Sequence, residues 1–208
     1  MAKNTDKLTK LPIEFYEQEN VVQIAHDLIG KIITTNIEGI ITSARIVETE
    51  AYVGISDKAS HAFAGRRTLR NEHMYAAAGI AYVYICYGMH QMFNVVTNKK
   101  EVPDAVLVRA AEPMLGMEDM LIRTRKQKAD YTITRGPGNM AKALGINKIH
   151  SGINLLGDII FIMQDEHLLK NEVIAASKRI GIDSAGADAL LPYRFFIKGN
   201  KYVSSRPR

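Results

Sequence analysis

Apolar and polar residues alternate along much of the chain with a period of two, which predicts a sheet-rich protein. Strands are expected over residues 31–35, 39–53, 80–87, 92–97, 105–111, 158–163 and 193–197. Helical spacing is rarer. It predicts a helix over 20–29 that ends at Gly30, a helix over 113–126 with Pro113 at its first position, and a helix over 139–144 after Gly-Pro-Gly.

The predicted strands outnumber the helices that could join parallel strands, so the expected fold class is α+β rather than a doubly wound parallel sheet. No repeat or Pro/Gly/Ser-rich linker divides the 208 residues, and we expect a single domain over 1–208. Residues 1–11 are polar and predict a flexible N-terminal tail, not a signal peptide. No apolar stretch approaches the roughly 20 residues of a membrane helix. We therefore expect an intracellular protein that does not bind a membrane.

Charge and cysteine content narrow the function without fixing it. Lys and Arg number 27 against 22 Asp and Glu, a net charge of +5 at pH 7. This balance favours a polyanionic partner, although a mildly basic enzyme with no such partner shows it equally well. The single cysteine, Cys86, excludes an internal disulfide and a cysteine-built metal site. It also fits a reducing compartment.

Two carboxylates and a tyrosine share one face of the strand predicted over 39–53. Strand alternation places Glu48, Glu50 and Tyr52 together, with small or apolar residues on the other face. The polar face could line a catalytic cleft. The alternative is an ordinary solvated face of an antiparallel strand, and this pattern alone favours the alternative.

Tyrosines are concentrated in the strand predicted over 80–87. Tyr82 and Tyr84 share a face, and Tyr87 stands at the end of the strand before Gly88, where a turn could project its ring. Because tyrosine is a favoured strand residue, the concentration can be purely structural. A base-stacking platform with a protruding wedge is the functional interpretation.

Residues 57–75 lack steady periodicity and predict a loop with functional side chains. Arg66, Arg67, Arg70 and Asn71 suit contacts with phosphates, although a solvated loop would carry the same residues. His61, His73 and His90 raise a metal site as an alternative, but none belongs to a compact ligand motif. The remaining histidines, His26, His150 and His167, are expected to be satisfied structural residues. Gly136-Pro137-Gly138 could offer backbone N–H groups to a phosphate, or simply start a helix.

The order of several sequence blocks resembles the alkyladenine (3-methyladenine) DNA glycosylase family. The blocks are RIVETEAY (45–52), ASHA (59–62), RN (70–71), YVYICYGMH (82–90), NVV (94–96), AVLVRAAEP (105–113) and GPGNMAKALGI (136–146). They cover most of the chain between residues 28 and 162. Two segments depart from the family pattern, 76–79, which lacks the usual proline, and 98–104, which is longer and more charged. These departures affect the expected shape of the DNA-contacting loop.

The resemblance implies a compact domain around a curved, mainly antiparallel sheet with flanking helices, and an enzyme that hydrolyses the N-glycosidic bond of alkylated or deaminated purines. By matched position, Glu50 activates the water and Arg109 helps to hold it. The walls of the base-binding pocket are Tyr52, His61 and Tyr84, and Asn94 screens the purine edge. Tyr87 enters the gap in the duplex, and Met89 joins Arg66, Arg67, Arg70 and Asn71 as expected contacts with the DNA backbone.

The implied protein is a monomeric repair enzyme that acts on double-stranded DNA. Its expected location is inside the cell with the DNA, which in a prokaryote means the cytoplasm or nucleoid. No metal or cofactor is expected. No lysine lies in the matched catalytic blocks, so we predict a water-using enzyme without Schiff-base strand cleavage. Two hypotheses compete with it: a non-catalytic nucleic-acid-binding module that uses the tyrosines for stacking, and a metal-dependent hydrolase based on the histidines.

Overall fold

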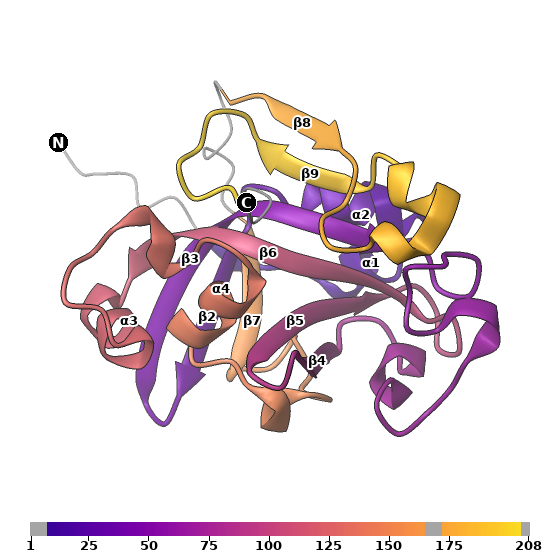
Figure 1. Cartoon of the computed structure of the whole chain (residues 1–208). Helices are drawn as coiled ribbons and strands as arrows, with labels where there is room; N and C mark the ends of the chain where they lie inside the picture. The colour runs from indigo at the N-terminus through magenta and orange to yellow at the C-terminus, as the bar shows by residue number, and fades with distance from the viewer. Residues whose placement is uncertain (1–7, 165–171, 205–208) are drawn as a thin grey trace, which may run out of the picture.

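An antiparallel sheet forms the centre of the protein in the computed structural model, which describes residues 8–164 and 172–204 (Figure 1). Within these ranges the main order of strands is β1-β7-β2-β3-β6-β5-β4, and β9 branches from β3 and pairs with β8. The strands are β1 (Thr9–Lys10), β2 (Ile32–Ile37), β3 (Ile40–Tyr52), β4 (Ala81–Cys86), β5 (His90–Thr97), β6 (Asp104–Leu115), β7 (Ile160–Gln164), β8 (Ile174–Ser177) and β9 (Arg194–Ile197). The predicted α+β class and single compact domain are confirmed.

Short helices cover the sheet. The α-helices are α1 (Ile13–Tyr16), α2 (Val21–Asp27), α3 (Met117–Thr124) and α4 (Pro137–Ala143). The 3-10 helices are η1 (Phe63–Gly65), η2 (Glu72–Tyr75), η3 (Tyr131–Ile133), η4 (Lys148–His150) and η5 (Asp183–Leu190). Helix α2 packs on β3, and α4 packs on β5 and β6. In the parts of the chain that the structure describes, no helix is long and apolar enough to cross a membrane.

Strand β3 is buried along most of its length because it has neighbours on every side. It pairs with β2, β6 and β9, and α2 packs against it. Ile46, Val47 and Ala51 belong to the hydrophobic core. Glu48 and Glu50 are also fully buried. The alternative of a solvated acidic face is therefore wrong, because β9 and the segments around Ile180 and Ser204 cover this face.

The pairing of β3 with β6 contains a bulge at Arg109. Glu48 pairs with Ala110 and Thr49 pairs with Val108, so Arg109 is an additional residue on the β6 side. A bulge changes the direction of a side chain without ending the ladder. Here it turns Arg109 toward the two carboxylates of β3.

The predicted helix over 113–126 starts too early. Strand β6 continues through Pro113 to Leu115, and the helix begins at Met117. Proline cannot donate a ladder hydrogen bond, and sheets accept it at bulges. The β3–β6 register shifts between Ser43 and Ala44, at the pairing of Ala44 with Pro113. Gly116, with φ +78°, then turns the chain into α3.

Both ends of the chain take a larger part in the fold than the sequence pattern predicts. Thr9 and Lys10 pair with β7 and Leu11 is buried, so the predicted tail over 1–11 is too long, and residues 1–7 lie outside the described part. Strand β8 and helix η5 were not predicted. Together with β9 they form a layer along one side of β3 (Figure 1).

Candidate active site

The carboxylate of Glu50 is fully buried and held by three donors. The Ile180 N–H donates to Oε1 at 2.7 Å. The Tyr52 hydroxyl and Nη1 of Arg109 donate to Oε2 at 3.0 Å and 3.1 Å. A carboxylate has about four acceptor positions. Oε1 accepts only one of these bonds, so it keeps a second acceptor position.

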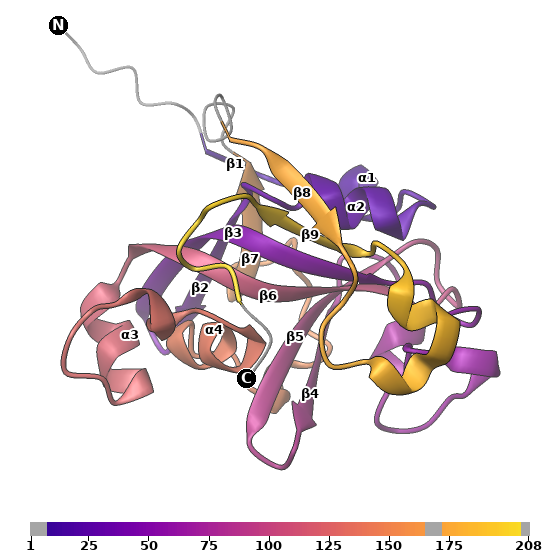
Figure 2. The same cartoon turned by 45° about the horizontal axis from the view of Figure 1, so that its top comes forward.

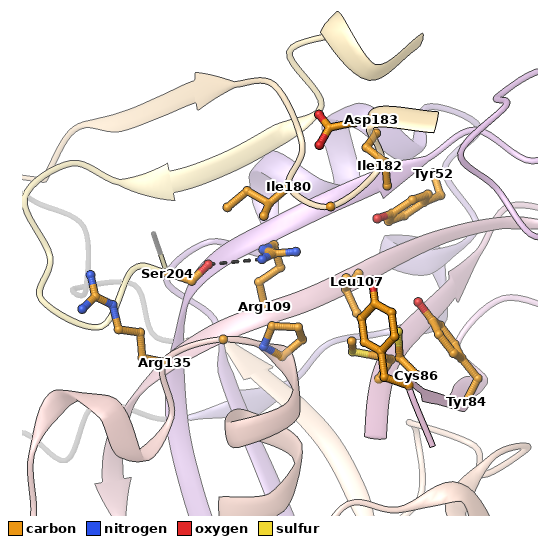
Figure 3. Close-up of a pocket in the computed structure, with 15 residues that line it drawn as sticks. Tyr52, Tyr84, Cys86, Leu107, Arg109, Arg135, Ile180, Ile182, Asp183 and Ser204 are labelled. Atoms are coloured by element: carbon orange, nitrogen blue, oxygen red, sulfur yellow. Dashed lines mark hydrogen bonds between the residues drawn. The ribbon is translucent and has the colours of Figure 1, made fainter. Parts of the chain in front are cut away.

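Arg109 connects Glu50 with its neighbour Glu48. Its Nε donates to Oε1 of Glu48 at 3.0 Å, and Nη2 donates to the Ser204 hydroxyl at 3.3 Å, the contact drawn in Figure 3. Arg109 as a whole is 7% exposed. A buried arginine bound to two carboxylates has a fixed orientation, and Arg109 also lines the cavity described next.

A cavity of about 660 Å³ lies over this pair and contains several residues that the sequence singled out. Tyr52 and Arg109 line it, with Glu50 directly behind them through the hydrogen bonds above. Figure 3 shows the rings of Tyr52 and Tyr84 entering the same space from different strands. The other lining residues are Cys86, Tyr87, Met92, Leu107, Arg135, Gly136, Pro137, Ile180, Gly181, Ile182, Asp183 and Ser204.

A second, much smaller cavity adjoins the first. Tyr52, His61, Tyr84 and Asn94 line it together with Ala59, Met74, Tyr82 and Ala105. All four residues expected in a base-binding pocket therefore meet in one place. This cavity measures about 20 Å³, roughly the space of one water molecule. The rings of His61 and Tyr84 are in edge-to-face contact with centroids 4.5 Å apart. A purine therefore fits only the larger cavity unless these rings separate.

The polar atoms around the small cavity are largely fixed. Nδ1 of His61 lies 2.9 Å from the Tyr82 hydroxyl. The amide nitrogen of Asn94 donates to the carbonyls of Tyr82 and Met92 at 3.1 Å and 3.2 Å. The carbonyl oxygen of Asn94 is therefore the atom it offers to a ligand.

Burial sets the protonation of the titratable groups. It raises the pKa of Glu50, which Glu48 also raises, while Arg109, the Ile180 N–H and Tyr52 lower it. Burial raises the pKa of Tyr52 well above its usual value, so its hydroxyl remains a donor. Burial lowers the pKa of His61 to about 4, assisted by Arg70 and Arg66. The His61 ring is therefore neutral near pH 7.

The β4–β5 turn carries two of the predicted DNA contacts, and both are strongly exposed. Tyr87 is 84% exposed with φ +50°, and Met89 is 71% exposed. Figure 2 shows the hairpin extending away from the rest of the sheet. Because Tyr87 also borders the large cavity, its ring stands beside the cavity entrance and faces solvent.

The loop residues divide into two groups. Arg66 and Arg70 border a polar cavity of about 240 Å³, and no carboxylate of the described residues pairs with either. Arg67 forms ion pairs with Glu72 and Glu101, both at 2.5 Å. Their charges offset that of Arg67.

Asn71 has a different place from the one expected. It is 2% exposed, and its amide donates to the carbonyls of His61 and Arg66 at 3.0 Å and 2.8 Å. Its side-chain oxygen accepts from Thr68 N–H at 2.7 Å. Asn71 therefore organises the loop from inside, and a contact with DNA would break these bonds.

The histidines do not come together. No group of three or more His, Cys, Asp or Glu in the described ranges could hold a metal ion. His73 bonds Ser151 at 2.8 Å, and His90 packs so closely on Gly138 that a Cβ there would lie 2.7 Å from its Nδ1. The Gly-Pro-Gly segment starts α4, as the simpler interpretation holds.

The other three histidines were expected to be satisfied structural residues. His26 contacts Asp27 at 2.9 Å, and Nδ1 of His150 accepts from the Asn147 N–H at 3.0 Å. His167 lies outside the described residues. The prediction is therefore met for the two histidines that can be placed.

Sequence reasoning missed the residues that close the site from the C-terminal side. Arg179 forms an ion pair with Asp57 at 2.9 Å, and its guanidinium carbon lies 4.8 Å from the Tyr52 ring centroid. It thereby supports the wall formed by Tyr52. Arg194 and Ser204 both contact Glu48. No local signal marks these residues, because Arg179 and Asp57 are 122 positions apart.

Comparison with known proteins finds similarity over most of the chain. The family model described as Methylpurine-DNA glycosylase (MPG) matches residues 14–201. A protein of Desulfitobacterium hafniense is 41% identical over 205 residues, which are 95% of this chain and 99% of that protein. One of Clostridium acetobutylicum is 42% identical over 204 residues, covering 94% and 97%. Both relatives bear the name "Putative 3-methyladenine DNA glycosylase".

Proposed function

Because the chain belongs to the methylpurine-DNA glycosylase family, we propose that it removes alkylated or deaminated purines from double-stranded DNA. The reaction is hydrolysis of the N-glycosidic bond, and its DNA product carries an abasic site. The observation that carries this proposal is the buried Glu50–Arg109 pair beside a tyrosine-lined cavity. A carboxylate in this position can activate water next to a bound nucleotide.

Access to the cavity requires the nucleotide to leave the duplex. Water cannot attack a stacked, paired base, so the enzyme must extrude it at a cost of a few kcal/mol. Lesions that pair poorly cost less to extrude, which contributes to selectivity. The exposed ring of Tyr87 is placed to occupy the gap, and its entry between bases would slow the return of the nucleotide.

Aromatic side chains would hold the extruded purine. Tyr52 and Tyr84 line the large cavity, and each stacking contact contributes about 1–3 kcal/mol. A cationic alkylpurine gains an additional attraction to the ring faces. His61 stands behind Tyr84 as a neutral ring, and the Asn94 carbonyl oxygen is available to the purine edge.

Glu50 then serves as base and as counter-charge. Its second acceptor position on Oε1 can take a proton from water while the sugar develops positive charge. The Ile180 N–H and Arg109 fix the carboxylate, so little reorganisation accompanies the reaction. An alkylated cationic purine leaves without protonation, so one carboxylate suffices for it.

The protein would act as a monomer that cleaves the N-glycosidic bond and leaves the DNA strand intact. No lysine of the described residues lines either cavity, which favours water over an amine nucleophile. Arg66, Arg70 and Met89 are exposed and could follow the DNA backbone. A non-catalytic binding module explains the tyrosines but not Glu50, because a carboxylate among stacking rings repels the backbone of DNA.

The test is incubation with duplexes that carry 7-methylguanine, ethenoadenine, hypoxanthine or no lesion. Free base and strand breaks are measured separately, with and without alkali. We expect base release from at least one lesion duplex and strand breaks only after alkali. Absence of base release from every lesion would refute the proposed function. Breaks without alkali would refute hydrolysis by water alone.

A further inference from the structure

A second arginine approaches the buried carboxylates from β9. Arg194 pairs with Glu50 in the β3–β9 register. Its Nε donates to Oε1 of Glu48 at 2.7 Å, and its side chain is 11% exposed. Nη1 donates to the Ser177 hydroxyl at 3.0 Å, and Nη2 donates to the Ser204 carbonyl at 2.8 Å. The guanidinium is therefore fixed by β8 and the C-terminal segment as well as by Glu48.

Glu48 is the centre of this arrangement. Besides the two arginines, the Ser204 N–H donates to its Oε2 at 2.6 Å and the Ser204 hydroxyl to its Oε1 at 2.7 Å. Glu48 and Glu50 thus share a buried cluster with Arg109 and Arg194. Two negative and two positive charges balance, as buried ions require.

We propose that Arg194 is a positioning residue that acts through Glu48. It supplies Glu48 with a positive charge of its own, which leaves Arg109 available to Glu50. This inference rests on the proposed function, in which Glu50 must be ionised to activate water. Without Arg194, a single buried guanidinium serves two carboxylates. Two Ser204 donors still hold Glu48 in place. Glu48 therefore competes more strongly with Glu50 for the guanidinium of Arg109.

Competition for Arg109 should change the pKa of Glu50, because that pKa depends on the charged groups around the carboxylate. The titratable and charged groups that face it are Arg109 from β6, Glu48 and Tyr52 from β3, Tyr84 from β4, and Arg179 with the Ile180 N–H from the segment after β8. Arg109 is the strongest of the contributions that lower the pKa of Glu50. Drawing Arg109 toward Glu48 therefore raises that pKa.

The first test is the pH profile of kcat/KM for R194Q, measured on a duplex that contains a cationic alkylpurine. We expect the acid limb to move up by about one pH unit, the order expected for one unit charge in a partly buried cluster. Binding of an abasic duplex should stay within about twofold, because Arg194 does not line the cavity. K198Q is the matched control. Lys198 is exposed directly after β9, and its removal should leave the limb unchanged.

The second test uses E48Q, which removes the competitor for Arg109. In the double variant E48Q/R194Q the acid limb should return to the parent position or below it. A purely structural role of Arg194 would give no such rescue. If R194Q does not fold, the comparison of E48Q with E48Q/R194Q decides the question: once Glu48 has lost its charge, the further loss of Arg194 should leave the limb where E48Q has it, and a further rise would overturn the inference.

The inference is overturned if R194Q keeps the parent limb, if the double variant keeps the R194Q shift, or if E48Q leaves the limb in place. The parent protein separates this failure from failure of the proposed function. If the parent releases no base, the proposed function fails. If the parent is active and the limbs do not move, only the role of Arg194 fails.

Discussion

Burial and pairing act on Glu50 in opposite directions. Desolvation and Glu48 raise its pKa, while Arg109, the Ile180 N–H and Tyr52 lower it, and the net direction is upward. A carboxylate with a raised pKa is a stronger base, provided that the pH stays above that pKa. Burial thus makes the Glu50 carboxylate a stronger base, and it also makes the activity more sensitive to low pH.

We predict a single acid limb in kcat/KM, above the ordinary range of a carboxyl group. Activity is present while Glu50 is ionised and falls as the pH drops through its raised pKa. His61 does not contribute, because its pKa of about 4 keeps it neutral across this range. The measurement is base release from a cationic alkylpurine duplex, between about pH 4 and pH 9. Activity that stays constant down to the ordinary pKa of a glutamate, about 4.3, would contradict the assignment of Glu50.

Tyr87 provides a second prediction at the scale of a residue. The variant Y87A should bind lesion duplex at least about tenfold more weakly, because one stacking contact is lost. Its thermal unfolding should match that of the parent, since the ring is 84% exposed. Y87F retains the ring and should bind nearly as the parent does. Equal affinity of Y87A and the parent would remove Tyr87 from the wedge role.

The bulged pairing of β3 and β6 is the element on which the site depends. It directs Arg109 toward β3, and the continuation of β6 through Pro113 fixes the start of α3. Gly116 at that corner has φ +78°. A Cβ there would lie 2.7 Å from the Ile41 carbonyl oxygen and 2.6 Å from Cγ2 of Thr42.

We therefore expect G116A to lower the free energy of unfolding by at least about 2 kcal/mol, because backbone strain and overlap add. G199A is the control. Gly199 has φ +81° but open space around its Cβ position, so only the strain of about 1 kcal/mol applies. Chemical denaturation measures both variants. Equal losses would show that the close packing at the β6–α3 corner has no energetic weight.

The sequence predicts β3 and the first part of β6, because the alternation of apolar and polar residues that forms a strand is a local pattern. Alternation over 39–53 and 105–111 was sufficient to predict β3 and the first part of β6, and it placed Glu48 and Glu50 on one face. It could not show whether that face is buried. The cover comes from Ile180, which is 130 positions from Glu50, and from Ser204, which is 156 positions from Glu48. No periodicity reports such distant contacts.

Residue type alone gives a wrong prediction where tertiary contacts determine the place of a residue. Proline favours the first position of a helix, yet Pro113 lies in a strand at a bulge. Asn71 resembles a DNA-contacting polar residue, yet its side chain is committed to the loop interior. The resemblance located the candidate residues, and the structure distinguished Arg66 and Arg70 from the ion-paired Arg67.

At the scale of the whole molecule, a net charge of +5 favours binding to a polyanion. The affinity for an abasic duplex should fall steeply with salt, because each neutralised phosphate contributes a slope of about −0.9 in log K against log salt. The double variant R66Q/R70Q should lose about two such contacts. R67Q should lose less, since Glu72 and Glu101 already pair with Arg67. A flat salt titration of the parent would contradict a DNA-tracking surface.

The most direct measurement of the central claim is single-turnover base release by E50Q from a duplex containing an alkylpurine that the parent cleaves. Glutamine retains the size of the side chain and removes its basicity. We predict that base release becomes undetectable while the Kd for abasic duplex stays close to that of the parent. Base release by E50Q at the parent rate would contradict the claim that this buried carboxylate activates the water.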